Sequence, residues 1–109
     1  MRRRVILDEC LPRKLKRVLG SAEVYTAHEA GFAGFKNGRL LAAISGNYDV
    51  FVTVDKSLRH QQNLSALPFG IVLIRVPSNA LEDLFPLATS LRNAIAEASP
   101  GNLIEVSGY

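Results

Sequence analysis

The sequence contains a single cysteine, Cys10, among its 109 residues. One thiol cannot form a disulfide framework within the chain, and it excludes a zinc site built from several thiolates. No apolar run approaches the roughly 20 residues that a membrane-spanning helix needs, and the apolar segment after the N-terminal arginines is too short for a signal peptide. We therefore expect a cytoplasmic protein that has no membrane segment.

The sequence also lacks a glycine-rich phosphate-binding fingerprint. Gly31, Gly34 and Gly38 lie close together, but their spacing fits neither G-x-G-x-x-G nor G-x-x-x-x-G-K-[ST]. We expect these glycines to serve backbone turns. Only two histidines are present, His28 and His60, and we interpret both as surface residues, with phosphate contact or general acid catalysis by His60 as the alternative.

The composition is that of an ordinary folded domain. Hydrophobic residues make up 48% of the chain and charged residues 21%, which are the proportions of a globular protein rather than of a disordered one. A chain of this length supports one hydrophobic core. We expect residues 1–109 to form a single domain.

Positive charge is concentrated at the N-terminal end. Residues 1–20 contain seven basic residues against Asp8 and Glu9, a net charge of +5, whereas residues 76–109 carry a net charge of −3. Such an asymmetry suits a polyanionic partner, because phosphate attraction requires only a basic patch. A solvated helix face is the alternative interpretation.

Apolar patterning predicts alternating strands and helices. The predicted strands cover residues 5–7, 23–26, 49–55, 70–74 and 103–106. The predicted helices cover residues 11–19, 37–45 and 79–98. We expect Asn37 and Asn79 to cap the second and third helices, and Pro86 either to begin the regular part of the last helix or to kink it. Residues 56–63 are polar and predict a loop or short helix.

Alternation of strands and helices is typical of the α/β class, with a mainly parallel sheet of four to five strands. Asp8 follows the first predicted strand, and Asp55 ends the third. Ligands of such sheets bind beyond the carboxyl ends of the strands. We therefore expect these two carboxylates to lie at the same edge of the sheet.

Neighbouring carboxylates repel each other unless a cation lies between them, and a hard divalent cation with oxygen ligands is the usual solution. We expect Asp8 and Asp55 to bind Mg²⁺ or Mn²⁺. Such a metal can activate water and stabilise the charge that develops on a phosphodiester. Four cations close to these acids in the sequence are candidates for binding a nucleic-acid backbone: Arg13, Lys14, Lys56 and Arg59. The alternative role for a strand-end aspartate is to cap the next helix.

The order of several motifs resembles a known family. The motifs are residues 7–12 (LDECLP), 29–38 (EAGFAGFKNG), 49–55 (DVFVTVD) and 78–84 (SNALEDL). They resemble the PIN-like family of small bacterial and archaeal proteins, which share an "LDE-LP" opening and a "T-D" third strand. The resemblance spans nearly the whole chain.

The resemblance implies a PIN-like three-layer sandwich and an acidic cluster that binds Mg²⁺ or Mn²⁺. It also implies endoribonuclease activity on RNA, with this protein as the toxin that pairs with an antitoxin protein. Asp8 and Asp55 match the acids of the first and third strands. PIN nucleases place a further acid on the helix between them, where this chain has Asn37. Glu9 and Glu29 are the nearby carboxylates, with Glu9 assigned to catalysis and Glu29 and Asn37 to supporting positions.

Two other functions remain open. The missing helix acid favours a catalytically degenerate PIN-like module that binds nucleic acid or a partner protein. A response-regulator receiver also carries acids after its first and third strands, but it requires a lysine at the end of its fifth strand, and residues 103–107 contain none.

Cys10 and three phenylalanines have less specific interpretations. We interpret Cys10 as a small buried residue, although a helix start would favour a thiolate. Phe32, Phe35 and Phe69 are candidates for the contact of a homodimer, and core packing explains them equally well. Stacking of Phe32 and Phe35 on RNA bases is a further alternative.

Overall fold

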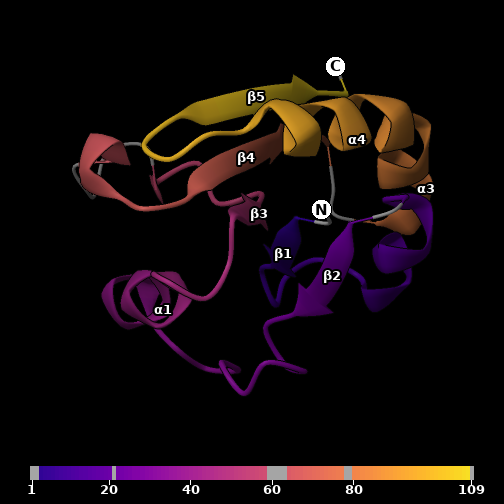
Figure 1. Ribbon diagram of the computed structural model, residues 1–109. Helices are drawn as coiled ribbons and strands as arrows, with labels where there is room; N and C mark the ends of the chain where they lie inside the picture. The colour runs from indigo at the N-terminus through magenta and orange to yellow at the C-terminus, as the bar shows by residue number, and fades with distance from the viewer. Residues whose placement is uncertain (1–2, 21, 59–63, 78–79, 109) are drawn as a thin grey trace.

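One parallel sheet organises the protein. The computed structural model describes residues 3–20, 22–58, 64–77 and 80–108. The strands are β1 (Arg4–Leu7), β2 (Glu23–Thr26), β3 (Val50–Thr53), β4 (Gly70–Arg75) and β5 (Leu103–Ser107). They lie in the order β2-β1-β3-β4-β5, and every neighbouring pair is parallel (Figure 1). The α/β class and the parallel sheet predicted from the sequence are confirmed.

The central strands are buried on both faces, which explains their nearly continuous apolar sequences. Successive side chains of a strand point to opposite faces. In β1, Val5 and Leu7 pack in one core cluster and Ile6 packs in the other. The sheet therefore separates two cores.

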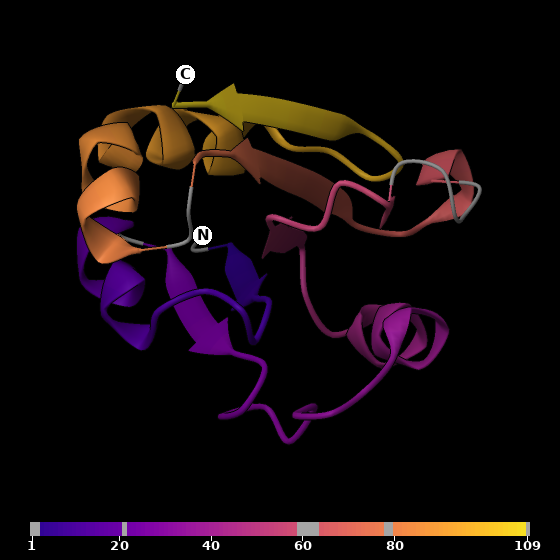
Figure 2. The same cartoon turned by 180° about the vertical axis from the view of Figure 1, so that it is seen from behind.

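Helical segments cover both faces of the sheet and make three layers (Figures 1 and 2). One face packs on η1 (Arg13–Val18), α3 (Leu81–Leu84), η3 (Phe85–Leu87) and α4 (Ala88–Glu97). The other face packs on α1 (Asn37–Ile44). Leu64, the first residue of η2 (Leu64–Ala66), packs against the same core. None of the helices in the described ranges is both long and apolar enough to cross a membrane.

The first helical segment is a 3₁₀ helix, whereas the sequence predicts an amphipathic α-helix. Its bonds are of the i→i+3 type: the N–H of Leu15 donates to the carbonyl of Pro12, and that of Leu19 to the carbonyl of Lys16. Over so short a segment the 3.0 and 3.6 periods bury similar side chains, so the apolar pattern could not distinguish them. Leu15 and Leu19 are buried as the pattern predicts.

The prediction that Asn37 caps the second helix is wrong. Helix α1 begins at Asn37, and the preceding residue, Lys36, occupies the N-cap position without a side-chain hydrogen bond. Gly38 therefore lies in the first turn of α1 rather than in the preceding loop. The helix ends before Gly46, whose φ of +83° favours glycine.

The last helix is interrupted where Pro86 predicts a kink. The 3₁₀ segment η3 contains this proline and separates α3 from α4. The predicted cap Asn79 lies outside the described residues, and Ala80 holds the N-cap position of α3. Phe69 is fully buried in the core on the α1 side, so of its two interpretations core packing is confirmed and the dimer contact is not.

Candidate functional site

The strand order reverses between β1 and β3, because the chain adds β2 on one side of β1 and the later strands on the other. In open parallel sheets this is the place where ligands bind, at the carboxyl ends of the strands. Asp8 directly follows β1 and its N–H donates to the carbonyl of Val52 in β3, 2.9 Å away. Asp55 follows the last residue of β3 by two positions. The structure therefore places both predicted acids at this edge.

The hydroxyl of Thr53 connects the two acids. It donates to Oδ2 of Asp8 at 2.7 Å and accepts from the N–H of Asp55 at 3.0 Å. Thr53 is fully buried at the end of β3. Sequence reasoning includes this threonine in the "T-D" motif but gives it no role, although a threonine that ends an otherwise apolar strand was a visible signal.

Asp8 forms a second bond within its own turn. Its Oδ1 accepts from the N–H of Glu9 at 2.8 Å. A carboxylate offers about four lone-pair sites. Each oxygen of Asp8 therefore retains the capacity to accept a further bond or to bind a cation.

Asp55 also starts the turn after β3. Its Oδ1 accepts from the N–H of Ser57 at 3.0 Å and from the hydroxyl of the same serine at 2.6 Å. The carbonyl of Asp55 accepts from the N–H of Leu58. The described part of the chain donates no hydrogen bond to Oδ2 of Asp55. Asp55 thus closes the turn after β3 with one carboxylate oxygen.

A thiol lies beside the carboxylate of Asp8. Cys10 is exposed, so its interpretation as a buried residue is wrong. Partial burial of the thiol, followed by the negative charge of Asp8, raises the pKa of Cys10 to about 11. The raised pKa favours the protonated thiol at neutral pH and disfavours the thiolate that was the alternative interpretation of this residue.

Glu9 points toward the loop that follows β2. Its Oε2 accepts from the N–H of Gly34 at 3.0 Å. Gly34 has a φ of +81°, which favours glycine at this position. Glu9 therefore holds the loop against the end of β1, and its bond to Asp8 comes from its backbone N–H rather than from its side chain.

Glu29 is bound to a different set of partners. Its N–H donates to Oγ1 of Thr26 and its Oε1 accepts from the N–H of Thr26, which is the reciprocal arrangement of a capping box. Lys16 donates to both carboxylate oxygens, at 2.8 and 2.9 Å. These hydrogen bonds, that from Lys16 first, lower the pKa of Glu29 from 4.5 to about 2. None of these bonds leads to Asp8 or Asp55.

The donor set suits a magnesium or manganese ion held by few protein ligands. In the described ranges, no three His, Cys, Asp or Glu side chains come together as a group that could hold a metal. Mg²⁺ usually keeps several waters and is bound by one or two carboxylates together with substrate phosphates. Asp8 and Asp55, each with unused acceptor capacity, meet that requirement.

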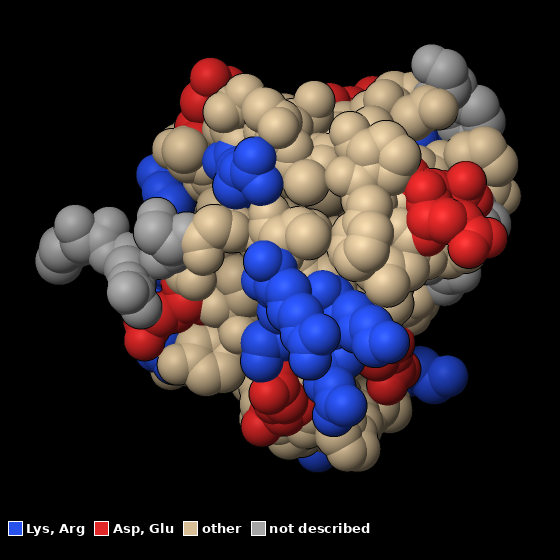
Figure 3. All heavy atoms as spheres, turned by 90° about the vertical axis from the view of Figure 1, so that its right-hand side faces the viewer, with Lys and Arg blue, Asp and Glu red and all other residues tan. Residues whose placement is uncertain are grey.

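The predicted cations lie in two places. Arg13 and Lys14 are exposed on η1, and Lys56 is exposed directly after Asp55. Figure 3 shows Lys and Arg side chains gathered on the side of the molecule formed by η1 and the last helices, with acidic groups at the border. Arg59 and His60 lie outside the described residues, and the side chain of Asn37 is not described.

A recess of about 510 Å³ lies between the segments that follow β1 and β2. The residues that line it are Glu9, Leu11, Arg13, Thr26, His28 and Glu29. It opens at the same edge of the sheet as Asp8. Sequence reasoning could not find this recess, because two loops far apart in the chain form it.

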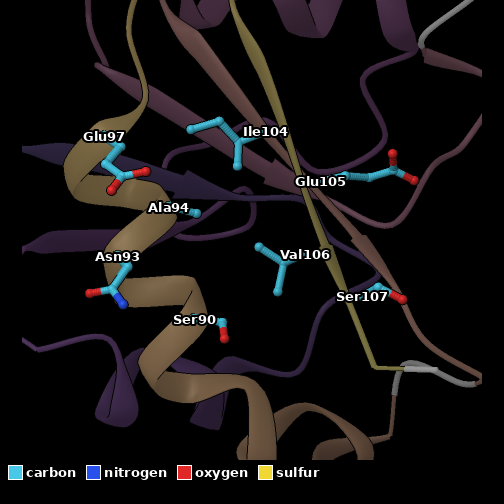
Figure 4. Close-up of a pocket in the computed structure, with 8 residues that line it drawn as sticks. All are labelled: Ser90, Asn93, Ala94, Glu97, Ile104, Glu105, Val106 and Ser107. Carbon is cyan, nitrogen blue, oxygen red and sulfur yellow. The ribbon is translucent and has the colours of Figure 1, made fainter.

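A second hollow of about 290 Å³ lies between α4 and the edge strand β5. Ile104 and Val106 point toward α4, while Glu105 points away from it (Figure 4). Ser90, Asn93 and Glu97 line the helix side. This hollow lies far along the sheet from β1, and its described lining residues include neither Lys nor Arg.

Comparison of the chain with protein-family models, with curated proteins and with solved structures finds no match.

Proposed function

We propose that this protein is a metal-dependent endoribonuclease of the PIN-like type, in which Asp8 and Asp55 bind Mg²⁺ or Mn²⁺. The observation that carries the proposal is the buried hydroxyl of Thr53, which bonds to Asp8 and to the backbone of Asp55 where the strand order reverses. Two acidic residues fixed beside each other at a ligand-binding edge, one by its carboxylate and one by its backbone, favour a site for a hard cation.

The bound metal would supply activation of water and stabilisation of charge on the phosphodiester. The chain's own residues would bind and orient. Asp8 and Asp55 provide the acidic ligands, and Thr53 fixes the carboxylate of Asp8. Lys56, beside Asp55, and Arg13 on η1 are exposed cations that can bind the RNA backbone.

Lys14 and Arg59 belong to the same proposed RNA-binding set. Glu9 is proposed as a catalytic side chain of secondary importance, since its Oε2 is bonded to Gly34. Glu29 and Asn37 are proposed as supporting residues only. The bonds of Glu29 to Lys16 and Thr26 restrict it to an indirect effect through the loop.

The wider biological role follows from the resemblance of the sequence motifs alone. It is that of a toxin in a toxin–antitoxin pair, acting on RNA in the cytoplasm and neutralised by a small antitoxin protein. A homodimer is part of the same proposal. Phe32 and Phe35 are half-buried and stack on each other with ring centroids 5.5 Å apart. The exposed parts of their rings are the proposed contact of the homodimer.

The test is cleavage of an RNA mixture with and without Mn²⁺ by three proteins: wild type, Asp8→Asn and Asp49→Asn. Asp49 is a matched control, because its carboxylate accepts from the N–H of Arg4 at the start of β1 and lies at the opposite edge of the sheet. We expect cleavage to disappear in Asp8→Asn and to persist in Asp49→Asn. Full activity of Asp8→Asn would contradict the proposed site.

A second candidate is a binding module that has lost catalysis. It is favoured by one observation: in the described residues no three acidic side chains come together as a group that could hold a metal, since Glu9 is bonded to Gly34 and Glu29 is paired with Lys16. This candidate predicts RNA binding that is independent of divalent metal and is unaffected by Asp55→Asn. Metal-dependent turnover lost on that substitution would exclude it.

A further inference from the structure

We propose that the recess between the β1 and β2 loops is a base-recognition subsite that binds one nucleotide of single-stranded RNA. The inference rests on the proposed function and deepens it, because it names the part of the substrate that this surface selects. The recess is about 510 Å³, within the usual size of small-ligand pockets.

The walls of the recess are fixed before any ligand binds. Glu9 is bonded to Gly34, which ties the β1 loop to the β2 loop. Thr26 and Glu29 bond to each other on the opposite wall, and Lys16 holds Glu29 from η1. A site whose groups are already ordered loses less free energy on binding.

One cation in the lining, Arg13, can bind a nucleotide phosphate. Arg13 is exposed at the recess and forms no ion pair within the described part of the chain. Glu29 is neutralised by Lys16 at 2.8 Å, so it repels an incoming phosphate little. Arginine binds phosphate through a planar fork of donors. Arg13 is therefore the proposed phosphate ligand.

The remaining side chains suit a base. His28 is exposed at the recess and offers a flat ring on which a base can stack. Oε2 of Glu9 is occupied by Gly34, whereas no described residue donates to Oε1. A free carboxylate oxygen accepts from an exocyclic amino group of a base. Uracil offers a ring N3–H but no exocyclic amino group, so we expect the recess to bind adenine, cytosine and guanine more tightly than uracil.

The location connects the recess to the proposed cleavage site. Glu9 directly follows Asp8 and donates its N–H to that carboxylate. The hollow between α4 and β5 lacks these features, because its titratable lining residues are the acids Glu97 and Glu105 (Figure 4). Of these two hollows in the described chain, the carboxyl-edge recess is the one that combines a cation, a ring and an acceptor.

The experiment is an NMR titration of the intact, metal-free protein with AMP, CMP, GMP and UMP, and with a short single-stranded RNA. We expect shifts of the amides of Glu9, His28 and Glu29, with weaker binding of UMP. Arg13→Gln should weaken binding roughly tenfold, the effect of losing a charge-assisted hydrogen bond. Arg39→Gln removes the same charge from α1, on the other face of the sheet, and should leave binding unchanged.

A further variant tests base selection. Glu9→Gln keeps the acceptor for Gly34 and removes the charge, so the preference for amino-bearing bases over UMP should shrink while binding of the phosphate persists. Retention of the full preference would overturn the assignment of Glu9.

Four further outcomes would overturn the subsite. Two concern the nucleotides: no shift of the Glu9, His28 and Glu29 amides at several millimolar nucleotide, or an equal loss of affinity in Arg13→Gln and Arg39→Gln. The other two concern the RNA: binding at another surface, or an affinity no higher than that of a mononucleotide. Cleavage of RNA without binding at the recess would overturn this inference and leave the nuclease proposal standing. Binding at the recess without any metal-dependent cleavage would support the inference and count against the nuclease proposal.

Discussion

Thr53 donates a 2.7 Å hydrogen bond to the carboxylate of Asp8, 45 positions earlier in the sequence. The same hydroxyl accepts from the N–H of Asp55. One buried side chain thus fixes the end of β1 relative to the segment that follows β3.

Replacement of Thr53 by valine should destabilise the fold by about 1–3 kcal/mol, because a carboxylate oxygen and a backbone N–H lose their partner. Mn²⁺ affinity should also fall, since Asp8 is no longer held. Urea unfolding and calorimetry measure the two effects. Thr53→Ser retains the hydroxyl and should preserve metal affinity; equal loss of affinity in both variants would contradict the role of this bond.

The Glu29 carboxyl should make stability depend on acid pH. Its pKa is about 2 in the folded protein against an ordinary value of 4.5. The folded state therefore binds fewer protons in this range, so the stabilisation is complete above pH 4.5 and is lost as the pH falls toward 2. Urea unfolding from about pH 6 down to about pH 2.5 should show a steeper decline for wild type than for Glu29→Gln, which keeps the acceptor oxygen.

The control for that comparison is Glu23→Gln, at the start of β2, which should follow the wild-type profile. Parallel declines of wild type and Glu29→Gln would show that the pair with Lys16 does not contribute.

Alkylation of Cys10 should report on Asp8. With the pKa of the thiol raised to about 11, iodoacetamide should react slowly near neutral pH compared with the same cysteine in the urea-unfolded chain. Asp8→Asn removes the neighbouring charge, so the reaction should accelerate, whereas Asp49→Asn should leave the rate unchanged. An unchanged rate in Asp8→Asn would place the cause of the slow reaction elsewhere.

The basic side chains of η1 should contribute to RNA binding in proportion to their charge. The double variant Arg13→Gln/Lys14→Gln should weaken single-stranded RNA binding and reduce the slope of log K against log salt by roughly 0.7 for each phosphate that is no longer neutralised. Fluorescence anisotropy at several salt concentrations measures both quantities. Lys36→Gln/Arg39→Gln removes two charges near α1, and equal weakening in that control would mean that only net charge matters.

Much of the fold is predictable because its signals are local. The branched apolar runs of β3 and β4 identify buried strands, and Gly46 and Pro86 mark a helix end and an interruption. The edge position of Asp8 follows from strand direction alone. The distinction between a 3₁₀ and an α-helix at η1 depends on the hydrogen-bond partner of each N–H, which the apolar period does not encode.

The site is less predictable because its decisive contacts join distant residues. The bond between Thr53 and Asp8 requires the register of β1 against β3, in which Leu7 pairs with Val52. The pairing of Glu29 with Lys16 joins the β2 loop to η1, and it removes an acid that the spacing offered to the metal site. The capping box of Thr26 and Glu29 did have a sequence signal, T-x-x-E, which could have identified this role.

The most direct test of the account is isothermal titration of Mn²⁺ into wild type, Asp8→Asn, Asp55→Asn and the control Asp49→Asn. We predict binding to wild type and to Asp49→Asn, and loss of binding in the two variants at the carboxyl edge while all four proteins remain folded. Undiminished Mn²⁺ binding by both Asp8→Asn and Asp55→Asn, or no binding by wild type, would contradict a metal site at this edge.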